Sequence, residues 1–355
     1  MIELALLTAP APADEITGGH RYDAEMLARA TRHGVRMRVV AISGKTVVGR
    51  ALASRRALQA LGGVDAIVVD SIVAAPLALA GPAPRPLVGL VHQIPASFAA
   101  SPLDRAADGL ARALYRRCEL VVAVSDWASS RLRSLGVPLA VVAPGVDPAR
   151  RSTPKSNDVA QILCVANWLP HKGILELAAA VSRLPDGAGV LHLVGATRAA
   201  TRYGRRVAER LARDDLRARV VAHGTLRGDA LAAAFAGADV FALPSRGEAY
   251  GIAFAEALAN GLPIVACHSG NVPALVGAAG TFVDPGDVEG LAWALALLIG
   301  DAERREELAA AARTRAATLP SWDESASAFF SAIRSGTHFA PRLRRDDRDR
   351  AATSA

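Results

Sequence analysis

Short runs of apolar and often β-branched residues recur along the whole chain, and a polar or glycine-containing turn follows most of them. Runs of about four to eight such residues are typical of buried strands. In the first half of the chain we expect strands at 2–7, 37–42, 66–69, 87–91, 120–124 and 140–142. In the second half we expect strands at 161–166, 189–194, 219–222, 240–243, 263–266 and 281–283.

Between these runs, apolar residues recur at the spacing of an amphipathic helix, for example over 22–32, 103–117 and 252–260. Strands that alternate with helices indicate βαβ units, whose strands form a parallel sheet. We therefore predict an α/β fold of two doubly wound, Rossmann-like domains that face each other across a cleft. Ligands of such sheets bind beyond the carboxyl ends of the strands, so we expect the chemistry in the loops that follow the strands.

The chain of 355 residues is long enough for two domains. A polar, proline-containing stretch at 151–158 predicts a linker between a first domain over 1–150 and a second domain over 159–318. Residues 319–335 are expected to form a helix that packs back on the first domain. Residues 336–355 hold mostly charged and small side chains and are expected to be disordered.

Composition argues against several classes of protein. The cysteines Cys118, Cys164 and Cys267 are far apart in the sequence, which argues against a disulfide framework and against a cysteine zinc site. No apolar run reaches the roughly 20 residues of a membrane-spanning helix, and the run Ile2 to Leu7 lacks the basic flank of a signal peptide. We therefore expect a cytoplasmic protein, with peripheral contact at the inner membrane face as a variant of that location.

The net charge of +7 is concentrated in the first 150 residues and in the tail. Such an excess attracts anionic acceptors, nucleic acids or anionic membranes, but ordinary surface charge is the simpler interpretation, and we expect no nucleic-acid partner. Over 103–118 the helical spacing places leucines on one stripe and arginines on the opposite one: Leu103, Leu110 and Leu114, and Arg105, Arg112 and Arg116. Basic amphipathic helices can lie on anionic membranes, although a solvated face above a buried one is more common.

The strand expected at 240–243 is followed by the loop Pro244-Ser-Arg-Gly-Glu-Ala-Tyr-Gly251 and then by a helix. Glycines let the backbone approach a ligand closely, and the free amides of a helix N-terminus attract phosphate. Glu248 lies in this loop. Glu256 lies on an apolar face of the helix, where a carboxylate needs a partner such as the two hydroxyls of a ribose or a sugar. The alternative is that Glu256 is solvated and that Glu248 caps the helix.

A second loop, Asn167-Trp-Leu-Pro-His-Lys-Gly173, follows the strand expected at 161–166. Lys172 stands there just before a helix, where an ammonium group can bind phosphate; an exposed loop lysine is the alternative. In the first half, Gly18-Gly19-His20 and His92 follow expected strands. A histidine at such a place can hydrogen-bond a sugar or carry a proton, although a lone histidine is more often structural.

The sequence contains none of the motifs of zinc hydrolases, serine hydrolases, P-loop proteins or nicotinamide-binding folds. Taken in order, its loops resemble the retaining family 4 glycosyltransferases, which have the GT-B fold. The most specific part is 244–263, where Glu248 and Glu256 have the family's Glu-x7-Glu spacing. Further segments match in the family's order over residues 2–335: Thr17-Gly-Gly19, Val91-His92, Val124-Ser125, Ala143-Pro-Gly-Val-Asp147, Pro170-His-Lys-Gly173, Leu193-Val-Gly195, His223-Gly224 and Asp284-Pro-Gly-Asp287.

The resemblance implies transfer of a sugar from a nucleoside-diphosphate sugar to an acceptor hydroxyl, with retention of the donor's anomeric configuration. Glu256 would bind the ribose, Lys172 the diphosphate, and Glu248 and His92 the donor sugar. The residues implied as catalytic are His92, Lys172 and Glu248. The residues implied in donor binding are Gly18, Gly19, Asn167, Lys172, Gly195, Arg246, Glu248, Ala249, Tyr250, Gly251, Ile252 and Glu256.

By the same resemblance, the first domain would bind the acceptor, which would be a sugar, a lipid or a small molecule. The leaving diphosphate would act as the base, so neither a protein nucleophile, nor a metal, nor any other cofactor is expected. Asn167 stands where the family commonly has an arginine, and Arg246 or Arg198 is a candidate to replace that charge. Two other functions stay open, an epimerase acting on sugar nucleotides and a non-catalytic scaffold with the same fold.

Overall fold

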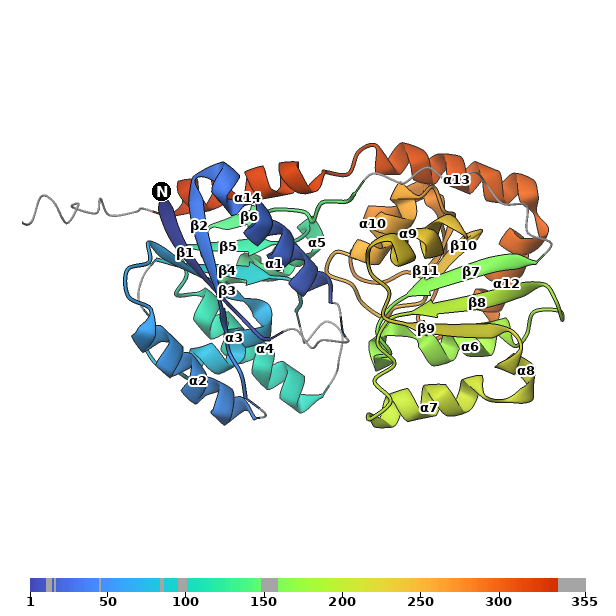
Figure 1. Cartoon of the computed structure of the whole chain (residues 1–355), viewed down its shortest axis with the longest axis horizontal. Helices are drawn as coiled ribbons and strands as arrows, with labels where there is room; N and C mark the ends of the chain where they lie inside the picture. The colour runs from blue at the N-terminus through green and yellow to red at the C-terminus, as the bar shows by residue number, and fades with distance from the viewer. Residues whose placement is uncertain are drawn as a thin grey trace, which may run out of the picture.

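The structure is a computed structural model of the chain and describes residues 1–10, 15, 17–44, 46–83, 86–94, 101–147 and 159–337. Figure 1 shows two lobes side by side, each of them a sheet flanked by helices. The first lobe holds the residues up to 147 together with the last helix, and the second holds residues 159–316. The expected linker at 151–158 and residues 338–355 of the tail expected over 336–355 lie outside the described residues. Gly336, the first residue of that expected tail, is the last residue of the final helix instead.

The sheet of the first domain has six parallel strands in the order β2-β1-β3-β4-β5-β6. The strands are β1 (Ile2–Thr8), β2 (Val35–Ala41), β3 (Ala66–Asp70), β4 (Leu87–Val91), β5 (Leu120–Ala123) and β6 (Leu139–Val141). The strand order reverses between β1 and β3, because β2 lies on one side of β1 and the later strands lie on the other. Such a reversal opens a crevice at the carboxyl ends of the two strands.

The sheet of the second domain also has six parallel strands, in the order β12-β11-β10-β7-β8-β9, which is the Rossmann order. The strands are β7 (Ala160–Val165), β8 (Gly189–Val194), β9 (Val220–Gly224), β10 (Val240–Leu243), β11 (Ile264–Cys267) and β12 (Gly280–Val283). Here the order reverses between β7 and β10. Every strand expected from the sequence is present in the two sheets, and its ends differ from the prediction by at most two residues.

Helices connect the strands and cover the sheets. In the first domain they are α1 (Gly18–Arg29), η1 (Ala30–His33), α2 (Val47–Ala60), α3 (Ser71–Ala78), α4 (Pro102–Tyr115), α5 (Asp126–Leu132) and η3 (Arg133–Leu135). In the second domain they are η4 (Pro170–Lys172), α6 (Ile174–Val181), α7 (Arg202–Leu211), α8 (Asp214–Arg217), α9 (Gly228–Ala236), α10 (Ile252–Ala259), α11 (Val272–Val276), η5 (Gly277–Ala279), α12 (Val288–Gly300) and α13 (Ala302–Ala316). The α/β alternation predicted from the sequence is confirmed.

Strand β1 shows why the apolar runs predicted the sheets well. Leu4 and Leu6 belong to one core, which includes side chains of α1, whereas Ala5 and Leu7 belong to a separate core on the opposite face. Successive side chains of a strand alternate between its faces. Because helices cover both faces, nearly every position of the strand is apolar, as in most parallel sheets.

Helix α14 (Trp322–Gly336) lies across the first domain, although α13 before it belongs to the second (Figure 1). Its buried Trp322 and Phe329 share a core with the first sheet and with α1. Ser321 and Glu324 form a capping box, which defines where the helix begins. The first domain therefore has its core completed by a helix that follows the second domain in the sequence.

Two local expectations are wrong. The first helix begins at Gly18 rather than near residue 22, because Thr17 accepts a hydrogen bond from the amide of His20 and so caps the helix earlier. The leucine stripe expected on α4 does not form one buried face, since Leu103 is 81% exposed. The buried side of α4 is instead made by Ala111, Leu114 and Tyr115.

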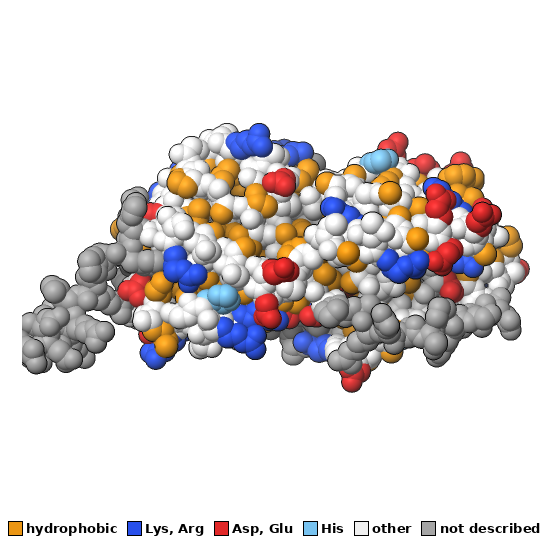
Figure 2. Space-filling model, turned by 90° about the horizontal axis from the view of Figure 1, so that it is seen from above, with side chains coloured by type: hydrophobic (Ala, Val, Ile, Leu, Met, Phe, Trp, Pro, Cys, Tyr) orange, Lys and Arg blue, Asp and Glu red, His pale blue; other side chains and the backbone are white. Residues whose placement is uncertain are grey.

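The described part of the chain contains no helix that is long and apolar enough to cross a membrane. The three cysteines are buried, and none of them forms a disulfide. Figure 2 shows the face seen from above, where basic and acidic side chains are interspersed. The net positive charge is therefore not gathered into one basic patch on that face.

Candidate active site

The two loops that carry Lys172 and Glu248 meet where the strand order of the second sheet reverses. Strands β7 and β10 are neighbours at this point, and the loops 166–173 and 244–251 follow them directly. Ligands of doubly wound sheets bind outside the carboxyl ends of the strands at such a reversal. The fold thus brings together the two loops in which the sequence predicted the chemistry.

Lys172 and Glu248 form an ion pair between these loops, in which Lys172 Nζ donates to Glu248 Oε1 at 2.6 Å. The two side chains are only 19% and 13% exposed, so Lys172 is not an exposed loop lysine. Glu248 does not cap α10, whose N-cap is Gly251 without a side-chain acceptor. His171 is neutral near pH 7, because burial and the charge of Lys172 lower its pKa to about 4. Of the two basic side chains in this loop, Lys172 therefore provides the positive charge.

The backbone around Glu248 is held by a close approach that requires glycine. Gly270 has a φ of +58°, and a Cβ at this position would lie 2.3 Å from the carbonyl oxygen of Glu248. The buried Asn271 donates from its backbone amide to that same oxygen at 2.9 Å, and from its side chain to the carbonyl of Tyr250 at 3.1 Å. The position of Glu248 is thus fixed by contacts of the main chain.

Helix α10 begins at the end of this loop. Gly251 is its N-cap with a φ of +103°, and no side chain accepts from the first amides of the helix. Uncapped amides carry partial positive charge, which suits phosphate binding. Across the domain junction, Gly18 begins α1, and a Cβ on Gly18 would lie 3.3 Å from Ile252 Cδ1. The first turns of α1 and α10 therefore meet between the domains (Figure 1).

Glu256, on the second turn of α10, forms an ion pair with Arg21 of the first domain. Arg21 Nη1 donates to Glu256 Oε1, and Nη2 donates to Asp147 Oδ2 at 2.7 Å. The guanidinium carbon also lies 5.7 Å from the ring centre of Trp322. Glu256 is 13% exposed and so is not solvated. Burial, and to a smaller extent Asp147, raise the pKa of Glu256, and Arg21 offsets part of this shift.

His92 follows β4 and lies beside Gly19, where a Cβ would be 3.1 Å from the histidine ring. Its Nε2 hydrogen-bonds Asp23 Oδ1 at 3.2 Å, and the two side chains are only 8% and 7% exposed. Burial alone lowers the pKa of His92, but the hydrogen bond to Asp23 and the charges of Asp70 and Asp23 outweigh it, so that this pKa lies above its ordinary value. His92 is therefore one half of a buried pair.

Asp23, Asp70 and His92 form a group in the described part of the chain that could hold a metal ion, since one ligand atom of each lies within 4.8 Å of the others. Asp70 already accepts hydrogen bonds from Thr8 Oγ1 at 2.6 Å and from the amide of Ile72 at 3.1 Å. Asp23 Oδ2 is buried and has no partner among the described residues. An imidazolium at His92 offsets one of the two carboxylate charges, and the two carboxylates raise the pKa of His92, so the group can hold a proton there.

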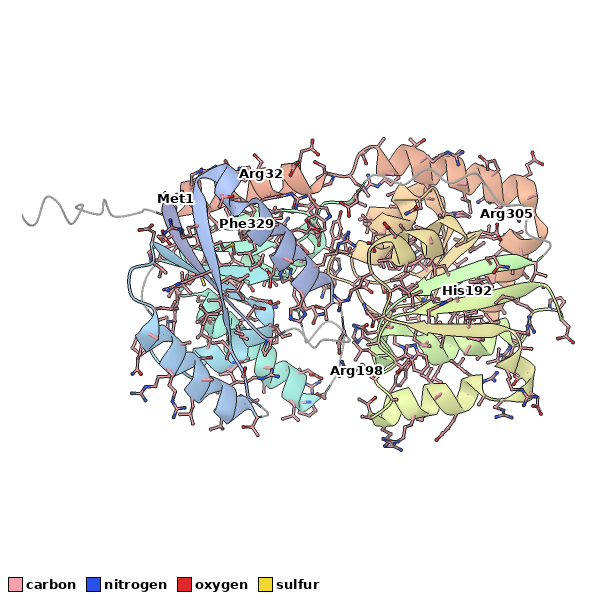
Figure 3. All side chains as sticks on the ribbon, in the orientation of Figure 1. Met1, Arg32, His192, Arg198, Arg305 and Phe329 are labelled. Atoms are coloured by element: carbon pink, nitrogen blue, oxygen red, sulfur yellow. The ribbon has the colours of Figure 1, made fainter. Side chains whose placement is uncertain are left out.

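Two arginines that the sequence placed near the donor are engaged elsewhere. Arg246 donates to Glu176 Oε1 and is half-exposed. Arg198 pairs with Glu15 of the first domain and lies on the side of the second domain that faces the first (Figure 3). Among the described non-glycine residues, Arg198 alone has a positive φ, of 50°. Among the described residues, neither side chain forms a hydrogen bond or an ion pair with Lys172 or with the two motif glutamates.

Three further residues of the expected donor site have contacts that stabilise the fold. Asn167 Oδ1 accepts from the amide of Ala196 at 2.9 Å. The amide of Gly195 donates to Gly224 O at 2.8 Å, which joins the ends of neighbouring strands. The side chain of Tyr250 is buried, and burial raises its pKa to about 12. These residues shape the loops around the ion pairs.

The sequence analysis missed side chains of the first domain that join the site. Arg21 and Asp23 lie on α1, directly after the glycines Gly18 and Gly19, but their partners are 235 and 69 positions away. Ser125 Oγ donates across the junction to the carbonyl of Ala249 at 2.5 Å. Ser125 could have been found from the sequence, because Val124-Ser125 is one of the segments that resemble the family. Nothing in the local pattern indicated the partners of Arg21 and Asp23.

Comparison with known proteins agrees with this geometry. Residues 13–150 match the family described as Glycosyltransferase Family 4, and residues 160–301 match Glycosyl transferases group 1. The chain is 30% identical, over 83% of its length and 82% of the relative's, to the GDP-mannose-dependent alpha-(1-6)-phosphatidylinositol monomannoside mannosyltransferase of Mycolicibacterium smegmatis. This relative extends through both domains.

Solved structures share the arrangement of the two domains. Sucrose-phosphate synthase from Thermosynechococcus elongatus is 19% identical and superposes with a TM-score of 0.82, over 94% of this chain and 99% of that one. Anabaena Alr3699/HepE in complex with UDP-glucose is 20% identical and superposes with a TM-score of 0.77, over 95% of this chain and all of that one (100%). The fold is GT-B, with two Rossmann-like domains, and the chain belongs to the family 4 glycosyltransferases.

Proposed function

We propose that the protein transfers a sugar from a nucleoside-diphosphate sugar to an acceptor hydroxyl, with retention of the anomeric configuration. The observation that carries the proposal is the pairing of Lys172 with Glu248 at the strand reversal of the second sheet, in the loop that leads into the helix of Glu256. In support, the mycobacterial relative is named as GDP-mannose-dependent, and the Anabaena structure holds UDP-glucose.

In this proposal the ribose hydroxyls donate to Glu256, and the diphosphate lies against Lys172 and the first amides of α10. Glu248 and His92 orient the donor sugar. The acceptor oxygen bonds to the anomeric carbon as the bond from that carbon to the diphosphate breaks, and the acceptor proton passes to a diphosphate oxygen. The products are the glycoside and the nucleoside diphosphate. The protein positions the reactants and stabilises the charge that develops on the leaving group.

Retention fits attack from the side of the leaving group. Glu248 is tied to Lys172 at 2.6 Å, so its carboxylate is held by a cation rather than free to act as a nucleophile. The departing diphosphate is then the available base. We propose that no metal ion or other cofactor takes part, since Lys172 and the helix N-termini provide the positive charge for the diphosphate.

The acceptor would bind to the first domain, which also offers a surface suited to an anionic membrane. Helices α2, α3 and α4 lie together on the side of the first lobe away from α1 and α14 (Figure 1). Large apolar side chains are exposed on these helices or at their ends, at Val47, Val48, Leu52, Leu79 and Leu103. Exposed arginines lie on or next to the same helices at Arg55, Arg56 and Arg116. Apolar residues flanked by basic ones favour binding at an anionic lipid surface.

Donor binding is the first test. Isothermal titration with UDP, GDP and ADP should find one that binds the wild type. Glu256→Gln should weaken this binding, because an amide offers the two ribose hydroxyls one uncharged acceptor oxygen in place of two charged ones. The wild type should bind the 2′-deoxy form of that diphosphate less tightly than the ribose form. Glu256→Gln should bind the 2′-deoxy form at least as tightly as the ribose form. The matched control is Glu306→Gln, whose side chain is 72% exposed on α13. If none of the three binds, the proposal is wrong and a scaffold role becomes the better explanation.

The stereochemistry needs its own measurement. The protein is incubated with an α-linked nucleoside-diphosphate sugar and a panel of sugar and lipid hydroxyl acceptors, and the product's anomeric proton is read by NMR. We expect an α-glycoside; a β-glycoside would overturn retention. Conversion of the donor to its epimer without any acceptor would instead support the epimerase alternative.

Binding of the α2, α3 and α4 surface to membranes is tested by sedimentation with phosphatidylglycerol vesicles and with neutral phosphatidylcholine vesicles. We expect the wild type to pellet with the anionic vesicles only, and Leu103→Ser combined with Arg116→Glu to stay in the supernatant. Equal behaviour of the wild type and the double variant would show that this surface does not bind lipid. The control carries Val221→Ser combined with Arg217→Glu, which makes a similar polar change and the same charge reversal at exposed residues of the second domain.

A further inference from the structure

The two carboxylates of the site are each paired with a cation, but the cations come from different domains. Lys172 belongs to the same domain as Glu248, whereas Arg21 reaches Glu256 from α1 of the first domain. All four side chains are mostly buried, with exposures between 13% and 23%. The charges of these four groups therefore cancel one another when the site holds no donor.

A nucleoside-diphosphate donor adds about two negative charges to these four groups, and Asp147 already places another negative charge beside Arg21. Lys172 already shares its charge with Glu248. His171 is neutral, because burial and Lys172 lower its pKa, and Asn167 carries no charge. The N-termini of α1 and α10 each contribute only about half of a positive charge. A further full positive charge near the diphosphate would stabilise the bound donor.

Arg21 stands where such a charge is needed. This step rests on the proposed function, in which ribose hydroxyls bind Glu256. Hydroxyls that occupy this carboxylate displace the guanidinium from it. A single methylene joins the ribose to the first phosphate, so a guanidinium that leaves Glu256 is within one sugar's width of the diphosphate. Arg21 also lies within one turn of Gly18, where α1 meets the start of α10.

Two contacts keep the guanidinium at the junction after it leaves Glu256. Asp147 accepts from Nη2 at 2.7 Å, and the ring of the buried Trp322 lies 5.7 Å away. A cation–π contact with an aromatic ring leaves the N–H edge of a guanidinium free, and this edge matches the geometry of phosphate oxygens. Arg21 can thus turn from the carboxylate to the diphosphate while its support stays in place.

We propose that Arg21 is a donor-binding residue that exchanges partners: the ribose replaces it on Glu256, and its guanidinium then binds the diphosphate. Arg21 and Glu256, which contact each other directly in this structure, then both bind the donor, which connects the two domains. The same guanidinium neutralises charge on the nucleoside diphosphate as the sugar leaves. The cation that Asn167 does not supply is, in this account, supplied by the other domain.

The test compares the binding of a diphosphate with that of its nucleoside. Arg21→Gln and Arg21→Lys are titrated with whichever of UDP, GDP and ADP binds the wild type, and with the corresponding nucleoside, at low and at physiological salt. We expect Arg21→Gln to lower the affinity for the diphosphate about tenfold or more, while its affinity for the nucleoside is unchanged or higher, because nothing competes for Glu256. Arg21→Lys should keep much of the diphosphate affinity.

The matched control is Arg32→Gln, which removes the same charge from the same domain at a side chain that is 69% exposed on η1. It should bind both ligands like the wild type. If Arg21→Gln binds the diphosphate as tightly as the wild type, or more tightly, Arg21 only competes with the donor and the inference is wrong. If Arg21→Gln weakens diphosphate and nucleoside equally, the effect is structural and the inference is also wrong. If the wild type binds none of the three diphosphates, the proposed function fails with it.

Discussion

At the scale of single residues, the site consists of charged groups that are buried but paired. Burying a charge is costly unless a partner satisfies it. Lys172 with Glu248, Arg21 with Glu256, and His92 with Asp23 follow this rule. These pairs stabilise the site when no ligand is bound. In the proposed function, a donor takes over one member of the Lys172 and Arg21 pairs.

The pair of His92 and Asp23 leads to a prediction about proton binding. Asp23→Asn removes the carboxylate that raises the pKa of His92, so this pKa should fall. The NMR titration of the His92 ring proton measures it directly. The raised pKa contributes stability that is fully present below the unfolded value of about 6.5 and is lost as the pH rises through the folded value. The advantage of the wild type over Asp23→Asn in free energy of unfolding should therefore shrink as the pH rises.

Asp186→Asn serves as the control for this titration, since its side chain is fully exposed in the second domain, far from His92. It should leave the titration of His92 unchanged. An unaltered pKa of His92 in Asp23→Asn would contradict the assignment of the pair as the cause of the shift.

The residues that carry charge could be predicted from the sequence only in part. Lys172, Glu248 and Glu256 stood out because they lie in glycine-containing loops, or in the helix that follows one, after apolar strands. Arg21 and Asp23 did not, because an arginine and an aspartate on a helix are ordinary surface residues until the partner is known. Their partners lie in other strands or in the other domain, and no local pattern contains that information.

At the scale of elements, the strands were predicted closely because both faces of each sheet are covered, and a strand buried on both faces is a continuous apolar run. Helix ends were predicted less well. Helix α1 begins at a threonine cap followed by two glycines, which are poor helix formers in the interior but tolerated in the first turn. On α4, Leu103 has helical spacing to Leu110 but lies in the first turn, beyond the packed part of the helix, and so stays exposed.

The loop that holds Glu248 depends on Gly270, and the chain offers a matched comparison. Gly270 and Gly34 have similar backbone angles, with φ of +58° and +68°, but a Cβ at Gly34 meets nothing within 4 Å. Gly34→Ala should cost about 1 kcal/mol of stability, the penalty of a left-handed alanine. Gly270→Ala should cost distinctly more, because its Cβ would meet the carbonyl of Glu248 at 2.3 Å.

Urea unfolding of the two variants measures this difference, and donor binding measures its effect on the site. Gly270→Ala should also weaken nucleoside-diphosphate sugar binding by displacing Glu248, whereas Gly34→Ala should not. Equal losses of stability in the two variants would show that the close approach at Gly270 contributes little.

At the scale of the whole molecule, the two domains are joined by polar contacts as well as by the chain. Ser125 donates to Ala249, Arg198 pairs with Glu15, and Arg21 pairs with Glu256. Most of the apolar packing stays within one domain or the other. A junction that includes several polar contacts suits domains that adjust to a ligand between them. Two-domain organisation could be read from the repeated strand pattern, but these contacts could not.

Because α14 belongs to the core of the first domain, a core substitution there should act on that domain. Phe329→Ala should destabilise it by about 3–5 kcal/mol, the usual loss for a buried phenylalanine. Hydrogen exchange should then rise in β1 to β5 and stay nearly unchanged in β7 to β12. The matched variant is Phe235→Ala in the core of the second domain, which should give the opposite distribution. Faster exchange of β7 to β12 in Phe329→Ala would mean that the domains unfold together.

The route of α14 also bears on the order in which the protein can mature on the ribosome. The first domain is translated first, yet the core between its sheet and α1 stays open until residues 322–336 have left the exit tunnel. The second domain has all of its strands and helices by residue 316. During synthesis the later domain can thus reach its native state before the earlier one, and an apolar face of the nascent first sheet is a natural place for a chaperone to bind in the interval.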